Sequence, residues 1–251
     1  MFQGHRVAVV VPAHNEALLI GRVIDTMPDW VDVVVVVDDA STDATAAVVS
    51  AKDDVRVRLV RHVRNKGVGA AIATGYVEAM GQADVVAVMA GDGQMDPADL
   101  EAVIEPVVSQ RASYCKGVRT WHPRRAEMPI LRRWGTQGLA WLTGKALRIE
   151  RLADSQCGYT AIASRVVGEL DLQGLWPRFG YPNDLLGQLR QRGIAIAQVP
   201  VRPVYATERS ELRARHGAVI LWLIARAAYR VRYRSVRGGS SFDGDNGFGR
   251  L

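Results

Sequence analysis

The sequence predicts an α/β protein with a mostly parallel sheet flanked by helices. Short apolar runs, typical of buried strands, alternate with segments whose apolar residues recur at helical spacing. Most of these runs end in polar or glycine-containing loops, which is where open α/β sheets bind ligands. The chain has 251 residues, enough for one large domain with a sizeable core.

The first half of the chain alternates between strands and helices. Strands are expected at residues 7–11, 32–37, 55–60 and 85–89. The third alternates as a half-exposed strand does, whereas the fourth is apolar throughout and should be buried on both faces. Helices are expected at residues 17–27, after the cap Ser41-Thr42-Asp43, after the segment 65–71 up to about Met80, and at 97–109. Asp96 would be the N-cap of the last helix and Pro97 its first residue.

The second half of the chain is less regular. We expect a strand at residues 114–119, a helix at 128–149 and another helix that begins at 183–186. Residues 1–208 would form the main domain, in two halves at 1–110 and 111–208. Residues 209–237 would form a basic amphipathic helix. Residues 238–251 are rich in Gly, Ser and Asp, and we expect a disordered tail.

Charge is distributed unevenly along the chain. Residues 1–110 contain 8 Lys and Arg against 16 Asp and Glu, whereas residues 111–251 contain 24 against 10. An acidic half suits a cation, and a basic half suits anions or an anionic surface. Stacking aromatic residues do not alternate with the arginines of the predicted sheet domain, so no nucleic-acid partner is expected.

Cysteine usage and the first residues predict a cytoplasmic protein. Cys115 and Cys157 are the only cysteines, and their spacing suits neither a disulfide framework nor a metal site. The chain enters its first strand without a charged and then apolar leader, so no signal peptide is expected.

The segment 209–237 has the composition of a membrane-surface helix. It contains eight Arg and one Glu, together with Trp222 and Tyr229. Its apolar run, residues 217–225, is too short to cross a bilayer. On a helix, five of the arginines fall within roughly 100° of one another. This predicts a helix that lies parallel to the membrane, on its inner surface. A helix that packs on the domain with a solvated basic stripe is the alternative.

Polar side chains follow three of the predicted strands. Glu16 follows the first strand, Asp38 and Asp39 the second, and Asp92 and Gln94 the fourth. The carboxyl ends of parallel strands meet at one edge, so these groups should lie together. Their oxygens suit a hard divalent cation that holds a diphosphate. A dinucleotide fold is excluded, because Gly-x-Gly-x-x-Gly does not follow the first strand.

At these residues the chain resembles the family 2 glycosyltransferases, which have the GT-A fold. The resemblance covers roughly residues 5–205 and rests on four motifs in order: Val11-Pro-Ala-His-Asn-Glu16, Val37-Asp-Asp-Ala-Ser41, Asn65-Lys-Gly-Val-Gly-Ala70 and Gly91-Asp-Gly-Gln-Met-Asp-Pro97. Asp154-Ser-Gln-Cys-Gly-Tyr159 is similar to a motif of the synthases that load a sugar onto dolichyl or polyprenyl phosphate. Residues 193–205 are similar to a strand pair that follows this motif in that group.

The resemblance implies a site for a nucleotide-diphosphate sugar in residues 1–110 and for its acceptor in 111–208. The residues expected at the nucleotide sugar are Pro12, Ala13, Glu16, Asp39, Lys66, Gly67, Asp92 and Arg119. Mg²⁺ or Mn²⁺ would be held by Asp92 and Gln94. However, Ala90 replaces the first acid of the family's Asp-x-Asp motif. A metal-free site that relies on arginines is the alternative.

The acceptor side contains two candidate bases. Asp154 is the first choice for a base or sugar contact, and Asp184 the second; Asp184 could instead be a first-turn acid favoured by the helix dipole. A hydroxyl acceptor needs such a base, whereas an ionised phosphate needs none. The residues expected at the acceptor or its phosphate are Arg132, Arg133, Gln156 and Arg209.

The sequence thus predicts an inverting glycosyltransferase that uses a donor of the UDP-glucose or GDP-mannose type. The acceptor that the Asp154 loop and the basic C-terminal helix favour is a polyprenyl or dolichyl phosphate. Two alternatives remain open. One is a transferase that acts on a soluble small-molecule acceptor, and the other, motivated by Ala90, is a non-catalytic nucleotide-sugar-binding protein.

Overall fold

The structure, a computed structural model, describes residues 1–204 and 214–237, with side chains for 1–204 and 217–232. Within these residues it has a seven-stranded sheet in the order β3-β2-β1-β4-β6-β5-β7. All neighbouring strands are parallel except where β6 pairs with β4 and β5. The strands are β1 Val7–Ala13, β2 Val33–Asp38, β3 Val57–Arg61, β4 Val85–Val88, β5 Tyr114–Val118, β6 Thr160–Ala163 and β7 Ile196–Pro200. The predicted α/β class is confirmed.

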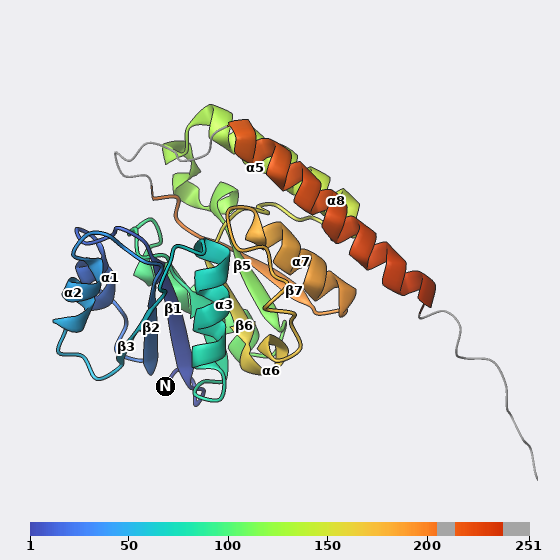
Figure 1. The fold of residues 1–251 in the computed structure, drawn as a ribbon. Helices are drawn as coiled ribbons and strands as arrows, with labels where there is room; N and C mark the ends of the chain where they lie inside the picture. The colour runs from blue at the N-terminus through green and yellow to red at the C-terminus, as the bar shows by residue number, and fades with distance from the viewer. Residues whose placement is uncertain (205–213, 238–251) are drawn as a thin grey trace, which may run out of the picture.

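Helices cover both faces of the sheet. α3 packs against β1 and β2 in front of the sheet in Figure 1, and α4 packs against β4, β5 and β6. The helices are α1 Ile20–Asp25, α2 Thr45–Ser50, α3 Val68–Ala79, α4 Leu100–Val108, α5 Ile130–Leu147, α6 Ser164–Val167, α7 Tyr181–Gln191 and α8 Ala214–Arg237. Three 3-10 helices precede α4 and α5: η1 Pro97–Asp99, η2 Arg119–Trp121 and η3 Pro123–Glu127.

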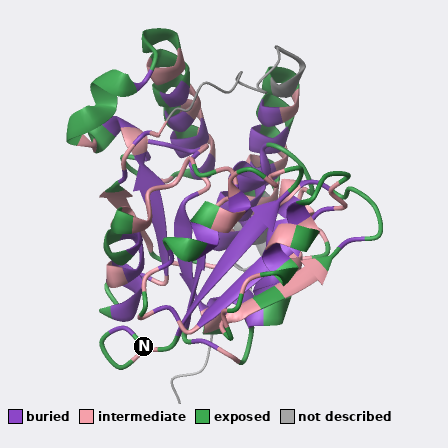
Figure 2. Cartoon of the chain, turned by 90° about the vertical axis from the view of Figure 1, so that its left-hand side faces the viewer, coloured by how far each residue is buried: buried purple, intermediate pink, exposed green. Residues whose placement is uncertain are grey.

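Burial follows the position of each strand in the sheet. Every residue of β1, β2, β4, β5 and β6 is buried, because these strands have neighbours on both sides and helices on both faces. The edge strands β3 and β7 are partly exposed, as the alternating sequence of the third predicted strand indicates. Figure 2 shows this contrast between the buried sheet and the exposed outer faces of the helices.

Two predicted elements differ from the structure. The first helix is shorter than residues 17–27, because the amides of Leu19 and Ile20 both bond to the carbonyl of Glu16, which makes a turn before α1 begins. The predicted strand pair within residues 193–205 is wrong for the described part: residues 193–204 contain β7 alone. Residues 201–204 instead leave the sheet toward the loop after β4, where the amide of Arg202 bonds to Asp99 at 2.6 Å.

The apolar face of α8 is turned toward the domain. Ile220, Leu223, Ile224 and Ala227 are buried, and α8 packs on α7 and α5. Gly187 of α7 allows this close approach, since a Cβ there would lie 2.6 Å from the Cβ of Ala227. α8 therefore matches the packing alternative for this segment. Among the described residues, no helix is long and apolar enough to cross a membrane.

Candidate active site

The loops after β1, β2 and β4 meet at the carboxyl edge of the sheet. The Asp39 amide donates to the carbonyl of Ala13 at 2.8 Å, and the Gly91 amide donates to the carbonyl of Pro12 at 3.1 Å. Pro12 and Ala13 are buried between their neighbours. The structure therefore brings together the predicted nucleotide-sugar residues of the first, second and fourth strands.

Asp39 organises the loop that follows β3. Its carboxylate accepts hydrogen bonds from the amides of Lys66, at 2.8 Å, and Gly67, at 2.6 Å. It also accepts from Nδ1 of His62 at 2.6 Å, because a carboxylate can only accept. Burial acts to raise the pKa of Asp39, but these bonds outweigh it and hold the pKa below its ordinary value. If Asp39 contacts the nucleotide sugar, it does so with a carboxylate that also holds the loop after β3.

Gly67 fits under a segment from the second half of the chain. Its φ is +97°, and a Cβ at this position would lie 2.5 Å from the carbonyl oxygen of Pro177. The amide of Ala70, in the first turn of α3, donates to the same carbonyl at 3.1 Å. Residues 174–180 therefore cross the N-terminus of α3, next to the Lys66–Gly67 turn.

We expect Gly67→Ala to weaken binding of the nucleotide sugar in addition to destabilising the fold. The substitution strains the backbone by about 1–2 kcal/mol and also pushes the Pro177 carbonyl away from the turn. Gly81→Ala is the matched control, because Gly81 has φ +79° but nothing within 4 Å of its Cβ position. Thermal unfolding with and without nucleotide sugar should show a larger loss of stability in Gly67→Ala, since only this variant also clashes with Pro177, and a reduced ligand-induced shift only in Gly67→Ala. Equal shifts would contradict a role for this turn in donor binding.

The loop after β4 is tightly folded around its own acids. Gly93 has φ +68°, and Oδ1 of Asp92 accepts the amide of Gln94 at 2.9 Å. Asp96 is the predicted N-cap, accepting the amide of Ala98 at 3.0 Å. Arg202 fixes the loop from the far end of the chain, with Nη1 3.1 Å from Oδ2 of Asp96. This loop is therefore held in place before any ligand binds.

The donor set at this loop fits a divalent cation only together with phosphate oxygens. Asp92 supplies a carboxylate and Gln94 a carboxamide, both oxygen ligands of the kind Mg²⁺ and Mn²⁺ accept. Within the described residues, no group of three His, Cys, Asp or Glu side chains is arranged to hold a metal. With Ala90 in place of an acid, Asp92 and Gln94 could hold a cation only if further oxygens, such as those of a diphosphate, completed its ligands.

Asp154 is buried and fully engaged. It accepts from Nε of Arg119 at 2.8 Å and Nη2 at 3.2 Å, and from the amides of Gln156 and Cys157 at 3.1 and 3.0 Å. Burial alone would raise the pKa of Asp154, but the charge and hydrogen bonds of Arg119 and the charge of Lys116 hold it below its ordinary value of 3.8. This is the environment of an ion-paired carboxylate, which is a poor proton acceptor.

Lys116 adds a second basic group beside Asp154. Its side chain has no exposed surface and donates to the carbonyl of Cys157, and burial lowers its pKa. We call Lys116, Arg119 and Asp154 the buried ion cluster. Lys116 pairs with Thr160, which pairs with Val88. The cluster therefore lies in the row at the end of β4, just before the Asp92 loop, and with all three groups ionised it carries one net positive charge.

Asp184, the second candidate base, is also buried between partners. Its Oδ2 accepts the amide of Trp176 at 3.0 Å, and its Oδ1 accepts Nη1 of Arg230 at 3.0 Å. Arg226 donates to the carbonyl of Gly174 at 3.3 Å. Asp184 thus connects α8 to the segment that crosses the N-terminus of α3, which is a structural position.

The remaining predicted site residues are in the loops after β1 and before β6, in α5, or outside the residues that the structure describes. Glu16 is half-buried in the loop after β1, where its amide donates to Thr45 at 2.8 Å, and Gln156 lies in the Asp154 loop. Arg132 and Arg133 are half-buried in the first two turns of α5. Arg209 lies outside the described residues.

Three residues of the site were missed from the sequence: His62, Arg202 and Arg230. Each bonds to a carboxylate of the predicted set or its loop, namely Asp39, Asp96 and Asp184. Their partners are 23, 106 and 46 positions away in the chain. Of these three residues, only His62 has a local signal, because it lies just after the third predicted strand.

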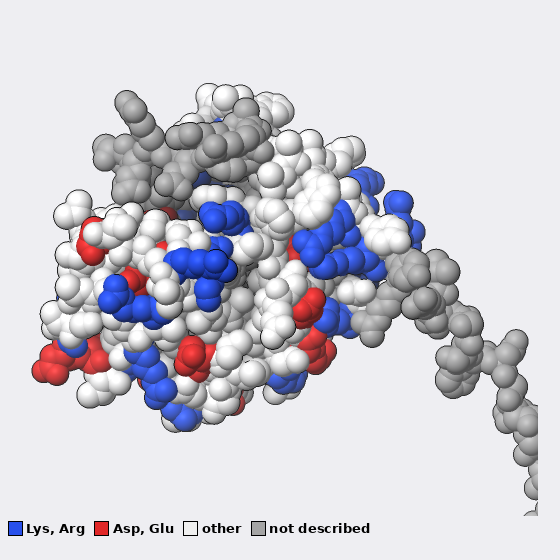
Figure 3. All heavy atoms as spheres, in the orientation of Figure 1, with Lys and Arg blue, Asp and Glu red and all other residues white. Residues whose placement is uncertain are grey.

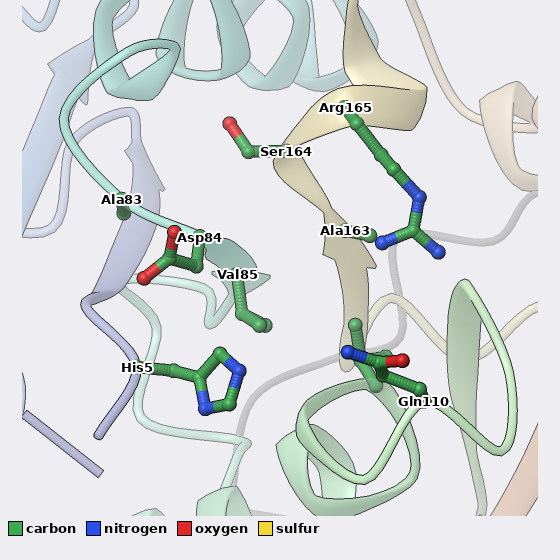
Figure 4. A pocket seen from close by; sticks show the side chains of 9 residues that line it. His5, Ala83, Asp84, Val85, Gln110, Ala163, Ser164 and Arg165 are labelled. Atoms are coloured by element: carbon green, nitrogen blue, oxygen red, sulfur yellow. The ribbon is translucent and has the colours of Figure 1, made fainter. Parts of the chain in front are cut away.

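A hollow lies at the opposite edge of the sheet. It has a volume of about 310 Å³ and is lined by His5, Asp84, Gln110 and Arg165, among others (Figure 4). Asp84 precedes the amino end of β4, and Arg165 follows the carboxyl end of the antiparallel β6. This hollow is therefore separate from the candidate site.

The sheet, the loops at its carboxyl edge and the acidic turn after β4 are those of a glycosyltransferase with a GT-A fold. The chain belongs to glycosyl transferase family 2, since its match to that family spans residues 8–158, more than half of the chain.

Relatives and solved structures agree with this assignment. The chain is 28% identical over 223 residues to the UDP-N-acetylglucosamine--dolichyl-phosphate N-acetylglucosaminyltransferase of Methanococcus voltae, covering 82% of this chain and 88% of that protein. It is 30% identical over 182 residues to the dolichol-phosphate mannosyltransferase of Pyrococcus furiosus, covering 66% and 49%. Its fold is similar to that of Mycobacterium tuberculosis glucosyl-3-phosphoglycerate synthase in complex with UDP, with a TM-score of 0.67, 24% identity and coverage of 91% and 81%.

Proposed function

We propose that the protein is an inverting glycosyltransferase that moves a sugar from a nucleotide-diphosphate sugar to a polyprenyl or dolichyl phosphate. The two dolichyl-phosphate transferases among its relatives support this acceptor class. A donor of the UDP-glucose or GDP-mannose type agrees with the predicted site, and the Methanococcus relative adds UDP-N-acetylglucosamine to the candidates.

The observation that carries the acceptor class is the state of Asp154. A hydroxyl acceptor must lose a proton as it attacks, so it needs a basic carboxylate in contact with it. Asp154 has both oxygens bonded to Arg119 and to backbone amides, and a lowered pKa. Asp184 is bonded to Trp176 and Arg230. With both candidate bases occupied in this way, the geometry favours an acceptor that arrives already ionised, as a phosphate does.

The proposed reaction is one in-line displacement. An acceptor phosphate oxygen forms a bond to the anomeric carbon while the bond from that carbon to the donor β-phosphate oxygen breaks. The nucleoside diphosphate leaves with the electron pair, so negative charge develops at its β-phosphate. With Lys116 and Arg119 both protonated, the buried ion cluster would add positive charge near this edge, which would favour both the acceptor anion and the leaving group. Asp92 and Gln94 would hold a Mg²⁺ or Mn²⁺ ion, which supplies electrostatic stabilisation of the diphosphate when bound.

Transfer assays with a panel of donors and acceptors test the proposal. A thermal-shift screen first selects the donor, because stabilisation grows as RT ln(1 + [L]/Kd). The selected donor is then incubated with detergent-dispersed polyprenyl phosphate, with a polyprenol lacking the phosphate, or with 3-phosphoglycerate. We expect product with polyprenyl phosphate only, and loss of product with EDTA that Mn²⁺ restores. If product forms only with a soluble acceptor, the proposed lipid acceptor is wrong. If the protein neither transfers the sugar nor hydrolyses the donor, it is a non-catalytic nucleotide-sugar-binding protein.

A further inference from the structure

The outer face of α5 exposes large apolar side chains. Ile130, Leu131, Trp134 and Trp141 are 67%, 85%, 68% and 65% exposed. At 100° per residue they fall within about 100° of one another, so they lie on one side of the helix. We call these four residues the α5 apolar stripe.

The inner face of the same helix is made of smaller residues. Thr136, Ala140, Thr143, Gly144 and Leu147 are buried, and α5 packs there against α8 and α7. The largest apolar residues of α5 therefore point away from the protein, the reverse of an ordinary amphipathic helix. A large exposed apolar patch rimmed by polar residues marks an interaction site.

We propose that the α5 apolar stripe docks on an anionic membrane surface. Tryptophan favours the boundary between lipid headgroups and acyl chains, because its ring is apolar while its N–H finds polar partners. Exposed Trp121 lies in η2, shortly before this helix, and adds a third such residue. The stripe covers the part of α5 from Ile130 to Trp141, about three turns that can lie flat on a membrane surface.

The basic residues around the stripe indicate that its partner carries negative charge. Residues 121–148 contain six Lys and Arg and one acid, Glu127, which is paired with Arg124. Arg125, Lys145 and Arg148 are exposed. Figure 3 shows further basic side chains over α8, which packs beside α5. A second copy of this chain would bring like charges together across this face, whereas anionic lipid headgroups would neutralise them.

The stripe is also placed to serve the active site. η2 starts at Arg119 of the buried ion cluster and leads through η3 directly into α5. A bilayer on the stripe would bring the headgroups of its lipids to the carboxyl edge of the sheet. This use of the surface rests on the proposed function, although the binding itself does not. It moves the predicted membrane contact from α8, whose apolar face is buried against α7, to α5.

Vesicle flotation without donor or acceptor tests the inference. The vesicles are phosphatidylcholine with and without phosphatidylglycerol. We expect the full chain to float with anionic vesicles, and Trp134→Ser/Trp141→Ser to lower the partition coefficient about tenfold or more at an unchanged unfolding temperature. Leu131→Ser, at the most exposed stripe position, should lower it to a lesser degree. The control Leu221→Ser/Tyr229→Ser removes apolar side chains of α8 that are 51% and 66% exposed and should bind as the unchanged protein does.

Three outcomes would overturn the inference: no binding of the unchanged protein, equal binding of the stripe variants, or loss of binding only in the α8 control. A dimer that the stripe variants convert to a monomer, seen by light scattering, would show that a second copy covers the stripe. The proposed function can fail independently of the membrane-docking inference. A protein that floats but does not glycosylate polyprenyl phosphate keeps the docking surface, and one that glycosylates the detergent-dispersed lipid without floating keeps the function.

Discussion

Replacing Asp92 with alanine should abolish sugar transfer and leave the fold intact. Asp92 is half-exposed in the loop after β4 and is the one acid retained from the family's Asp-x-Asp motif. Without it, the partial metal site keeps only Gln94, and the charge that develops on the leaving diphosphate loses its stabilisation. We expect kcat to fall by a factor on the order of 10³. The unfolding temperature should change little, because Asp92 is half-exposed and its hydrogen bond from the Gln94 amide is worth about 1 kcal/mol.

Two variants separate charge from geometry at this position. Asp92→Asn keeps an oxygen that can accept the Gln94 amide but removes the negative charge, so its transfer rate should resemble that of Asp92→Ala. Asp53→Ala removes an exposed acid on the loop before β3, at the opposite edge of the sheet, and should transfer at the unchanged rate. Near-normal turnover of Asp92→Ala, measured with saturating Mn²⁺, would remove Asp92 from the reaction.

Replacing Asp154 with asparagine should destabilise the protein more than any other single change considered. The substitution leaves Arg119 and Lys116 without their counter-charge in a site where Asp154 has no exposed surface. Breaking one partner out of a buried ion pair costs about 3–5 kcal/mol, a large part of the 5–15 kcal/mol by which a domain is stable. Glu105→Gln is the control, because the Arg111–Glu105 pair is exposed and such pairs contribute at most about 1 kcal/mol. Urea unfolding at neutral pH measures both.

The pH dependence of this difference follows from the lowered pKa of Asp154. A carboxyl group whose folded pKa lies below its unfolded value stabilises the protein fully above the unfolded value, 3.8, and loses that contribution as the pH falls through the folded pKa. The stability gap between the unchanged protein and Asp154→Asn should therefore be constant from neutral pH to about pH 5 and shrink below about pH 4. If Asp154 were instead the catalytic base, Asp154→Asn would keep its stability while its turnover collapsed.

The sequence predicts most of the fold because its information there is local. Each buried strand is a run of apolar residues, and a run such as Val33–Val37 has no other stable place in a domain of this size. The carboxyl edge follows from the same pattern, since parallel strands place their following loops side by side. Hence the residues after β1, β2 and β4 could be grouped before their distances were known.

The partners of the acids could not be predicted in the same way. Asp154 and Asp184 were proposed as bases because each is an acid in a suggestive motif, and nothing local reveals that Arg119 and Arg230 are bonded to them. Both pairs join residues far apart in sequence, 35 and 46 positions, and the Asp184–Arg230 pair forms only once α8 packs on α7. The exposure of the α5 apolar stripe depends on tertiary packing too, because the helical pattern shows an apolar face but not which side of the helix meets the protein.

The position of α8 has a consequence for the turn at Lys66–Gly67. Arg226 and Arg230 hold the segment at residues 174–180 from α8, through the carbonyl of Gly174 and through Asp184, which bonds to Trp176. The same segment lies against Gly67 and Gly69. Local undocking of α8 would therefore loosen this turn while the sheet stays paired, because α8 contributes no strand to it.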